Sequence, residues 1–293
     1  MKRSSILLFY VFAVFHAAVA QDAQKLLLPA DDYLTIAFFQ PDTTANPVEG
    51  NAAMRWWGDL MSKEIGKRIE TRFFVNLADF ENYLDTNKVE IAILNPLYII
   101  ENHKKRNIVP KIIAIRAGKP YYERAIIVGK DKEIKDIADL QGGILITTQL
   151  GDRIVDFIET IEFQGKINLK KTFSKVILET NPRFCLSKLT EKQADAALIP
   201  LKNYEILMDL LPDLRKSTRV LRTSQKIPLA AGCYFADVTN EQEMKPIFEA
   251  ALNIHKTPTG QQAMMIFKAE RWEEVSMKIF QPLVQALQKS HND

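Results

Sequence analysis

From residue 33 onward, short apolar runs rich in β-branched and aromatic residues alternate with segments of helical periodicity. Residues 34–39, 89–94 and 194–199 show the first pattern, and apolar side chains recur every third or fourth position in 54–65. Strands that alternate with helical crossovers are typical of a mainly parallel sheet covered by helices. The pattern therefore predicts an α/β protein.

The C-terminal part of the chain predicts a different arrangement. After a strand-like run at 229–235, the periodicity indicates three amphipathic helices at 240–255, 258–268 and 271–288. Trp272 is expected on a packed helix face. A strand that returns late in the sequence indicates that the chain comes back to the lobe in which it began.

Two lobes follow from this order. The Gly-Lys-Pro-Tyr-Tyr break at 118–122 is the expected crossing between them. Lobe 1 is expected to be discontinuous, consisting of 31–120 and 226–293, with 121–225 inserted as lobe 2. The architecture is thus two α/β lobes, each a mixed and mostly parallel sheet flanked by helices, joined by two hinge crossings.

Two Asn-Pro pairs directly follow predicted strands. Asn95 comes after the run at 89–94, and Asn181 comes after a short run at 176–178. Asn as the N-cap with Pro as the first helical residue is a favoured helix start. A helix that begins at the carboxyl end of a parallel strand directs free backbone N–H groups into the crevice where α/β proteins bind ligands. Asn95 and Asn181 are therefore candidate ligand contacts, although capping alone would explain them.

Other candidate ligand contacts share the same expected position, at strand ends that face the crevice or at the crossing. Each also has a structural interpretation: core packing for the aromatic residues, capping for the threonines and hinge packing for the tyrosine at the crossing. Tyr98, one helical turn after Asn95, would direct its hydroxyl toward the cleft. The set comprises Phe38, Phe39, Gln40, Asn95, Tyr98, Tyr122, Thr147, Thr148, Gln149 and Asn181.

The N-terminus has the features of an export signal. Lys2 and Arg3 precede an uncharged apolar stretch at 6–18, and Ala18-Val19-Ala20 forms an A-x-A cleavage pattern. We expect residues 1–20 to be removed after Ala20 and the mature protein to be secreted to the periplasm. Loss of the two basic residues lowers a formal net charge of +3 by two, so a nucleic-acid partner is not expected.

Reactive and metal-binding groups are sparse. Cys185 and Cys233 fit either a single disulfide or two buried thiols. The histidines lack ligand spacing, so neither a metal nor a cofactor is expected. Catalytic fingerprints such as G-x-S-x-G, H-E-x-x-H and the P-loop are missing from the sequence. We therefore do not expect an enzyme.

Five segments in order resemble the type II periplasmic binding proteins of the phosphate, phosphite and phosphonate transporter group. Residues 89–98 (VEIAILNPLY) are similar to the family's VDIAFLGPLSY run. The other segments are 137–142, 194–197, 223–228 and 258–263, similar to the family's LADLKGK, ADAG, TSPPIP and PEGQAIL. The resemblance implies two hinged lobes that close on a small solute and deliver it to the permease of an ABC transporter. A sensor kinase as the membrane partner would require the same lobes, and a monomer is expected.

The resemblance weakens at the positions that would bind a phosphorus oxyanion. Phosphonate-binding members carry a Ser-Thr-Ser-Gly loop, where this chain has Thr147-Thr148-Gln149-Leu150. Pro200 stands where those members carry Asp, and Pro182 stands near the position of their His. Two ligand classes remain open: an oxyanion of the family's type, or an apolar ligand such as a sterol or another lipid, carried across the periplasm.

Overall fold

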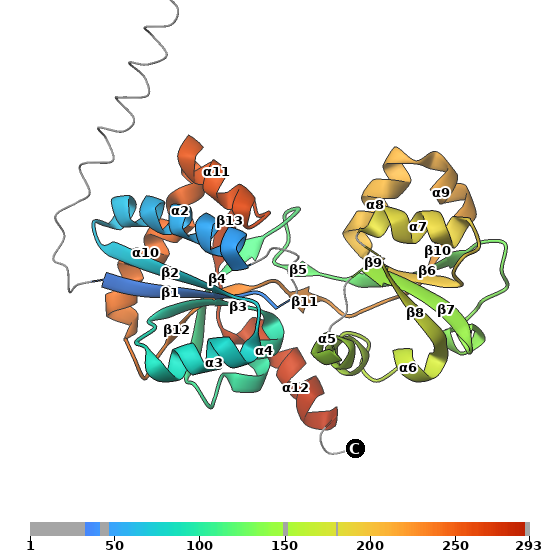
Figure 1. Cartoon of the computed structure of the whole chain (residues 1–293), viewed down its shortest axis with the longest axis horizontal. Coiled ribbons are helices and arrows are strands. Elements are labelled where there is room, and N and C mark those ends of the chain that lie inside the picture. The colour runs from blue at the N-terminus through green and yellow to red at the C-terminus, as the bar shows by residue number, and fades with distance from the viewer. Residues whose placement is uncertain (1–32, 42–46, 149–151, 180, 291–293) are drawn as a thin grey trace, which may run out of the picture.

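The computed structural model describes residues 33–41, 47–148, 152–179 and 181–290, and the expected signal segment lies outside them. Two α/β lobes stand side by side, joined by a narrow pair of strands (Figure 1). The joining strands are β5 (Tyr121–Tyr122) and β11 (Ile227–Pro228), which pair antiparallel. No helix in the described ranges has the length and hydropathy needed to cross a lipid bilayer.

Lobe 1 is built on a six-stranded sheet in the order β13-β4-β12-β3-β1-β2. Its strands are β1 (Tyr33–Phe39), β2 (Arg68–Phe74), β3 (Ile91–Leu94), β4 (Ile108–Ile115), β12 (Ala231–Phe235) and β13 (Arg271–Glu274). β1 runs parallel to β2 and β3, whereas β12 runs antiparallel to both β3 and β4. The late strand β12 thus returns to the middle of the first sheet.

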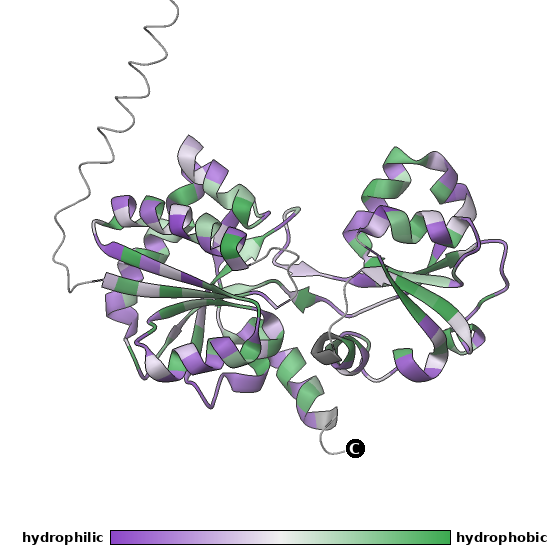
Figure 2. Cartoon of the chain, viewed as in Figure 1, coloured by the Kyte–Doolittle hydropathy of each residue, from purple (hydrophilic) through white to green (hydrophobic). Residues whose placement is uncertain are grey.

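Helices cover both faces of this sheet, and hydrophobic residues concentrate on the strands between them (Figure 2). One face carries α2 (Pro47–Ile65), α10 (Glu241–Asn253), the 3-10 turn η3 (Ile254–Lys256) and α11 (Pro258–Ile266). The other carries α3 (Leu77–Thr86), α4 (Pro96–Asn102), the 3-10 turn η4 (Met277–Phe280) and α12 (Gln281–Ser290). Because successive strand residues point to opposite faces, Phe38 packs into the first core and Phe39 into the second.

Lobe 2 is a five-stranded sheet in the order β10-β6-β9-β7-β8. The strands are β6 (Arg124–Gly129), β7 (Gly143–Thr148), β8 (Phe173–Glu179), β9 (Ala196–Pro200) and β10 (Thr218–Thr223). One face is covered by the 3-10 turn η1 (Ile137–Leu140), α5 (Asp152–Phe157), a π-helical turn η2 (Ile158–Glu162) and α6 (Leu169–Thr172). The opposite face is covered by α7 (Pro182–Thr190), α8 (Leu201–Leu210) and α9 (Pro212–Ser217).

The helix expected at 271–288 is wrong in its first part. Arg271–Glu274 forms the edge strand β13, which pairs antiparallel with β4. Trp272 is 2% exposed in the core while Glu273 and Glu274 face solvent. Four residues with a single buried side chain are too short to show a period of their own, so a helix-length window merges them with the helix that follows.

The two cysteines are buried free thiols in different lobes. Cys185 lies on α7 and Cys233 on β12. Burial raises the pKa of the Cys185 thiol to about 12, with the nearby Glu179 carboxylate adding to the effect. Burial alone raises the pKa of Cys233. Since the thiolate is the nucleophile, both groups are held in their unreactive form.

We expect neither cysteine to react with a thiol reagent such as DTNB in the native protein at pH 8, and both to react in urea. The reagent's absorbance counts the released thiols under each condition. A disulfide would instead give no free thiol in urea until a reductant is added.

Gly260, in the first turn of α11, should not tolerate a side chain. A Cβ placed there would lie 1.7 Å from the carbonyl oxygen of Ile254, which is backbone and cannot rotate away. Gly260→Ala is expected to lower the free energy of unfolding by about 1–3 kcal/mol or more, measured by urea titration. Gln262→Ala on the exposed face of the same helix is the matched control and should change it by less than about 0.5 kcal/mol.

Candidate ligand-binding site

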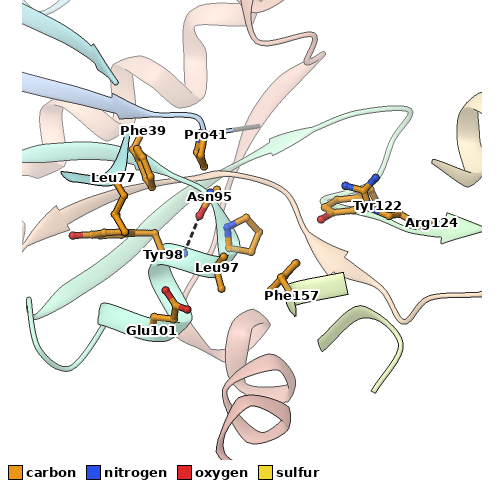
Figure 3. A pocket seen from close by; sticks show the side chains of 11 residues that line it. Phe39, Pro41, Leu77, Asn95, Leu97, Tyr98, Glu101, Tyr122, Arg124 and Phe157 are labelled. Atoms are coloured by element: carbon orange, nitrogen blue, oxygen red, sulfur yellow. Dashed lines mark hydrogen bonds between the residues drawn. The ribbon is translucent and has the colours of Figure 1, made fainter. Parts of the chain in front are cut away.

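A pocket lies where lobe 1, the hinge and lobe 2 meet. Its volume is about 80 Å³, several times the roughly 10–15 Å³ that one water molecule needs. Most of its wall comes from lobe 1, at the carboxyl ends of β1 and β3 and the start of α4, while β5, β6 and α5 complete it (Figure 3). The lining residues are Phe39, Pro41, Leu77, Asn95, Pro96, Leu97, Tyr98, Glu101, Tyr122, Arg124 and Phe157.

A rigid aromatic cluster supports the lobe 1 wall. The ring of Phe39 stacks on Phe80 with centroids 4.8 Å apart, and Tyr98 meets Phe39 edge to face at 5.5 Å. Aromatic pairs in these geometries add to the stabilisation from burial alone. The wall is therefore held in place before any ligand arrives.

Asn95 has the capping role expected from the sequence. Its Oδ1 accepts a hydrogen bond from the backbone N–H of Tyr98 at 2.8 Å, and Pro96 occupies the first helical position. The capping bond uses Oδ1, and Asn95 is one of the residues that line the pocket. Capping and ligand contact are thus compatible at this residue.

Tyr98 borders the pocket with its ring. Its hydroxyl donates a hydrogen bond to Glu81, which forms an ion pair with Arg106, so the hydroxyl is directed away from the pocket. Burial and the neighbouring Glu81 carboxylate raise the pKa of Tyr98. The hydroxyl is therefore a neutral structural donor, and the ring alone faces the pocket.

The other expected contacts on lobe 1 lie elsewhere. Phe38 is on the opposite face of β1, packed edge to face on Trp57 at 5.4 Å and stacked near Phe267 at 5.9 Å. Gln40 follows β1 and donates its backbone N–H to the carbonyl of Phe74, outside the pocket lining. Of the three neighbours Phe38, Phe39 and Gln40, only Phe39 lines the pocket.

Of the other expected contacts, Thr147, Thr148 and Asn181 of lobe 2 are likewise outside the pocket lining, whereas Tyr122 at the crossing is part of it. Thr147 is fully buried, and its hydroxyl donates to the carbonyl of Leu198 on the neighbouring strand at 2.7 Å. Thr148 is half-buried, and Gln149 lies outside the described residues. Asn181 caps α7 by accepting from the N–H of Phe184 at 3.2 Å, as its N-cap interpretation predicted.

Sequence reasoning missed the lobe 2 side of the pocket. Arg124 stands two residues after the expected contact Tyr122 and begins β6, and Phe157 is the last residue of α5. The signal that could have identified Arg124 is its position as the first strand residue after the crossing. No local pattern distinguishes Phe157 from its core neighbours.

Beside the pocket, the fully buried carboxylate of Glu162 joins the hinge to lobe 2. Tyr122 donates its hydroxyl hydrogen to Oε1 at 2.8 Å, and Nε of Arg124 lies 3.3 Å from Oε1 and 3.1 Å from Oε2. The Arg124 guanidinium also lies over the Tyr122 ring at 5.8 Å. Burial raises the pKa of Glu162, and Arg124 and Tyr122 oppose that rise by favouring the charged form.

The second crossing is attached to the same turn. The backbone N–H of Gln225 donates to the carbonyl of Glu162 at 2.9 Å, and its side-chain amide donates to the carbonyl of Ile161. The crossings are also bonded to each other, because Arg124 N–H donates to Ser224 Oγ and Ser224 N–H to the Arg124 carbonyl, both at 2.9 Å. The π-helical turn thus holds both hinge segments.

Two hinged α/β lobes with a pocket between them define a two-lobed solute-binding protein, and comparison with known proteins gives the particular family. The profile of the family described as "ABC transporter, phosphonate, periplasmic substrate-binding protein" matches residues 39–280. The chain belongs to this family. It is therefore a periplasmic substrate-binding component that delivers a small-molecule ligand to the permease of an ABC transporter.

Solved structures support the fold at low sequence identity. A binding protein of a phosphonate ABC transporter from Pseudomonas aeruginosa is 13% identical, with 89% of this chain and 87% of that chain covered and a TM-score of 0.60. A Prochlorococcus marinus protein in complex with methylphosphonate is also 13% identical, covering 89% and 99% at 0.61. A Xanthomonas citri protein bound to ATP is 12% identical, covering 89% and 99% at 0.62. None of the curated proteins matches the chain.

The raised pKa of Glu162 should make stability depend on pH in a defined direction. The unfolded chain releases this proton near pH 4, before the folded protein does, so the group's contribution to folding falls as pH rises from there through the folded pKa. The wild-type free energy of unfolding, relative to that of Glu162→Gln, is expected to decrease over this interval, measured by urea titration at several pH values. Glu133→Gln, at an exposed position of the same lobe, controls for the loss of one carboxylate. A constant or rising difference for Glu162→Gln would contradict the assignment.

Proposed function

We propose that the transported ligand is an amphiphilic organic solute, with an apolar body and one polar head, rather than a small phosphorus oxyanion. The observation that supports this most strongly is the apolar lining of the interlobe pocket. Phe39 and Leu97 of lobe 1 and Phe157 of lobe 2 border the same space. Burial of apolar ligand surface against them contributes about 25 cal/mol per Å².

Two polar side chains fit the head group of such a ligand. The Asn95 amide comes from lobe 1 and Arg124 from lobe 2, so a polar head between them would contact both lobes. Glu162 restrains Arg124 through its Nε edge. A ligand that touches both lobes stabilises their closed arrangement, which is the form that a transporter recognises.

The contacts of Thr147 argue against an oxyanion at the position of the family's hydroxyl-rich loop. Its hydroxyl is buried and bonded within the sheet. Charge-assisted hydrogen bonds to an anion contribute roughly 1.5–3 kcal/mol each, so loss of several weakens binding by orders of magnitude. The Prochlorococcus protein was solved with methylphosphonate, but 13% identity leaves ample room for a different ligand.

We further propose that residues 1–20 are the signal for export and that the mature chain begins at Gln21. The basic start, the apolar stretch and the A-x-A pattern support this. An amphiphile that crosses an aqueous compartment needs such a carrier, since its apolar surface is costly to expose to water. The protein performs no chemistry on its cargo in this proposal.

Calorimetric titration of residues 21–293 tests the ligand class. We expect binding of a medium-chain fatty acid or a solubilised sterol, and no submicromolar binding of phosphate or methylphosphonate. Comparison of the affinities for the fatty acid and for the sterol shows whether the pocket prefers a ligand with a narrow or with a broad apolar body. Submicromolar affinity for either phosphorus anion would overturn the proposal.

A variant at Leu97 tests whether the pocket binds that ligand. Leu97→Asn should weaken binding of the amphiphile by about tenfold or more, because the loss of one apolar contact costs roughly 1.5–3 kcal/mol. Ile206→Asn is the matched control, since Ile206 is an exposed aliphatic residue on α8, outside the pocket. Equal effects of the two variants on affinity would place the ligand elsewhere.

A further inference from the structure

The edge strand β8 of lobe 2 presents apolar side chains to solvent. It pairs with β7 on one side and is the last strand of its sheet. Val176 is 37% exposed and Leu178 is 56% exposed. An edge strand with exposed apolar residues is a ready template for pairing with another strand, and most proteins avoid one.

The sequence of β8 is chemically symmetric about its centre. Residues 175–179 read Lys-Val-Ile-Leu-Glu, so a base and an acid flank three aliphatic residues. In an antiparallel pair of two identical strands centred on Ile177, Lys175 of one copy lies opposite Glu179 of the other. Val176 then lies opposite Leu178, and the two-fold axis repeats both pairs.

We propose that two copies of the chain associate through β8, antiparallel and two-fold symmetric at Ile177, which makes one continuous sheet from the two five-stranded ones. The pairing forms two Lys175–Glu179 cross-strand ion pairs. It also brings Val176 and Leu178 of both copies together on one face. In this proposal the chain is a dimer, whereas a monomer was expected from the sequence.

The two faces of β8 have different surroundings, which supports this arrangement. Ile177 packs against the core beneath α7, and on the same face Glu179 forms an ion pair with Lys188 of that helix. Val176 and Leu178 therefore point to the other face, where they are exposed. Opposite-charge cross-strand pairs stabilise a sheet, and clustering of the four aliphatic side chains removes apolar surface from water.

The opposite edge of the same sheet cannot pair with itself in this way. β10 carries Arg219 and Arg222, and the equivalent antiparallel pairing centred between them would set these two arginines against each other. Like charges directly opposite destabilise a strand pair. Of the two edges of the lobe 2 sheet, β8 alone has a self-complementary sequence.

The association should be reversible and dependent on protein concentration. One strand pair with a small apolar cluster buries less area than the roughly 1,600 Å² of a standard stable interface. The ligand pocket lies at the hinge and contains no β8 residue. Dimerisation therefore stands independently of the proposed ligand.

Sedimentation equilibrium of residues 21–293 over two decades of concentration tests the dimer, with a pair of charge-exchange variants. In the dimer, residue 175 of each copy lies opposite residue 179 of the other. Lys175→Glu therefore makes both of these pairs acid against acid, and Glu179→Lys makes both of them base against base. Each variant alone should have a dimer dissociation constant raised by about tenfold or more. An equimolar mixture of the two should recover dimer, because every cross-strand pair then joins opposite charges.

Leu178→Ser tests the apolar part, and Leu210→Ser on α8, also exposed, is its matched control. The former should weaken the dimer and the latter should not. Thermal melting of each variant at a concentration where it is monomeric checks that the fold is intact, which matters for Glu179→Lys because it also removes the ion pair with Lys188. A wild-type chain that stays monomeric throughout, or a dimer that none of the β8 variants weakens, would overturn the proposal.

Discussion

Burial of the Glu162 carboxylate is the constraint around which the centre of the molecule is arranged. A carboxylate removed from water requires partners that compensate for its lost hydration. Tyr122 of the first crossing and Arg124 at the start of β6 supply them, and Gln225 of the second crossing bonds to the backbone of the same turn. The π-helical hydrogen bond from Phe163 N–H to the Ile158 carbonyl, at 2.9 Å, ends the helix there. Such π-helical turns often occur at functional sites.

The same turn also connects the lobes through apolar contacts. Phe157 and Ile161 join a hydrophobic cluster that contains Leu283 and Val284 of α12, the last helix of lobe 1. Polar anchoring of the hinge and apolar packing of α12 therefore meet on one short segment of lobe 2. Since Phe157 also borders the pocket, a change in the pocket acts directly on the surface between the lobes.

The sequence predicted those features, such as secondary structure elements and helix caps, that are determined by residues close together in the chain. The succession of strands and helices along the chain, the late return strand and the Asn95 and Asn181 caps follow from periodicity and capping chemistry, which operate over a few residues. The same local signals could not predict contacts between segments that are distant in the sequence. The Thr147 hydroxyl bonds to a strand 51 residues away, and Glu162 meets a partner 40 residues away. Which face of β1 becomes pocket and which becomes core depends on the helices that cover it, so Phe38 and Phe39 looked equivalent in the sequence.

The pairing of β5 with β11 has a consequence for how such a chain can arise and be re-engineered. Tyr122 lies opposite Ile227, so the polypeptide enters and leaves lobe 2 at almost the same point. A segment whose ends adjoin can be inserted into a host fold, or exchanged for another of different length, without displacing the host's own strands. Lobe 2 can therefore be regarded as a domain inserted into lobe 1, and in this sense as an exchangeable cassette. Exchange of the cassette would alter one wall of the pocket while leaving the other, with its aromatic support, unchanged.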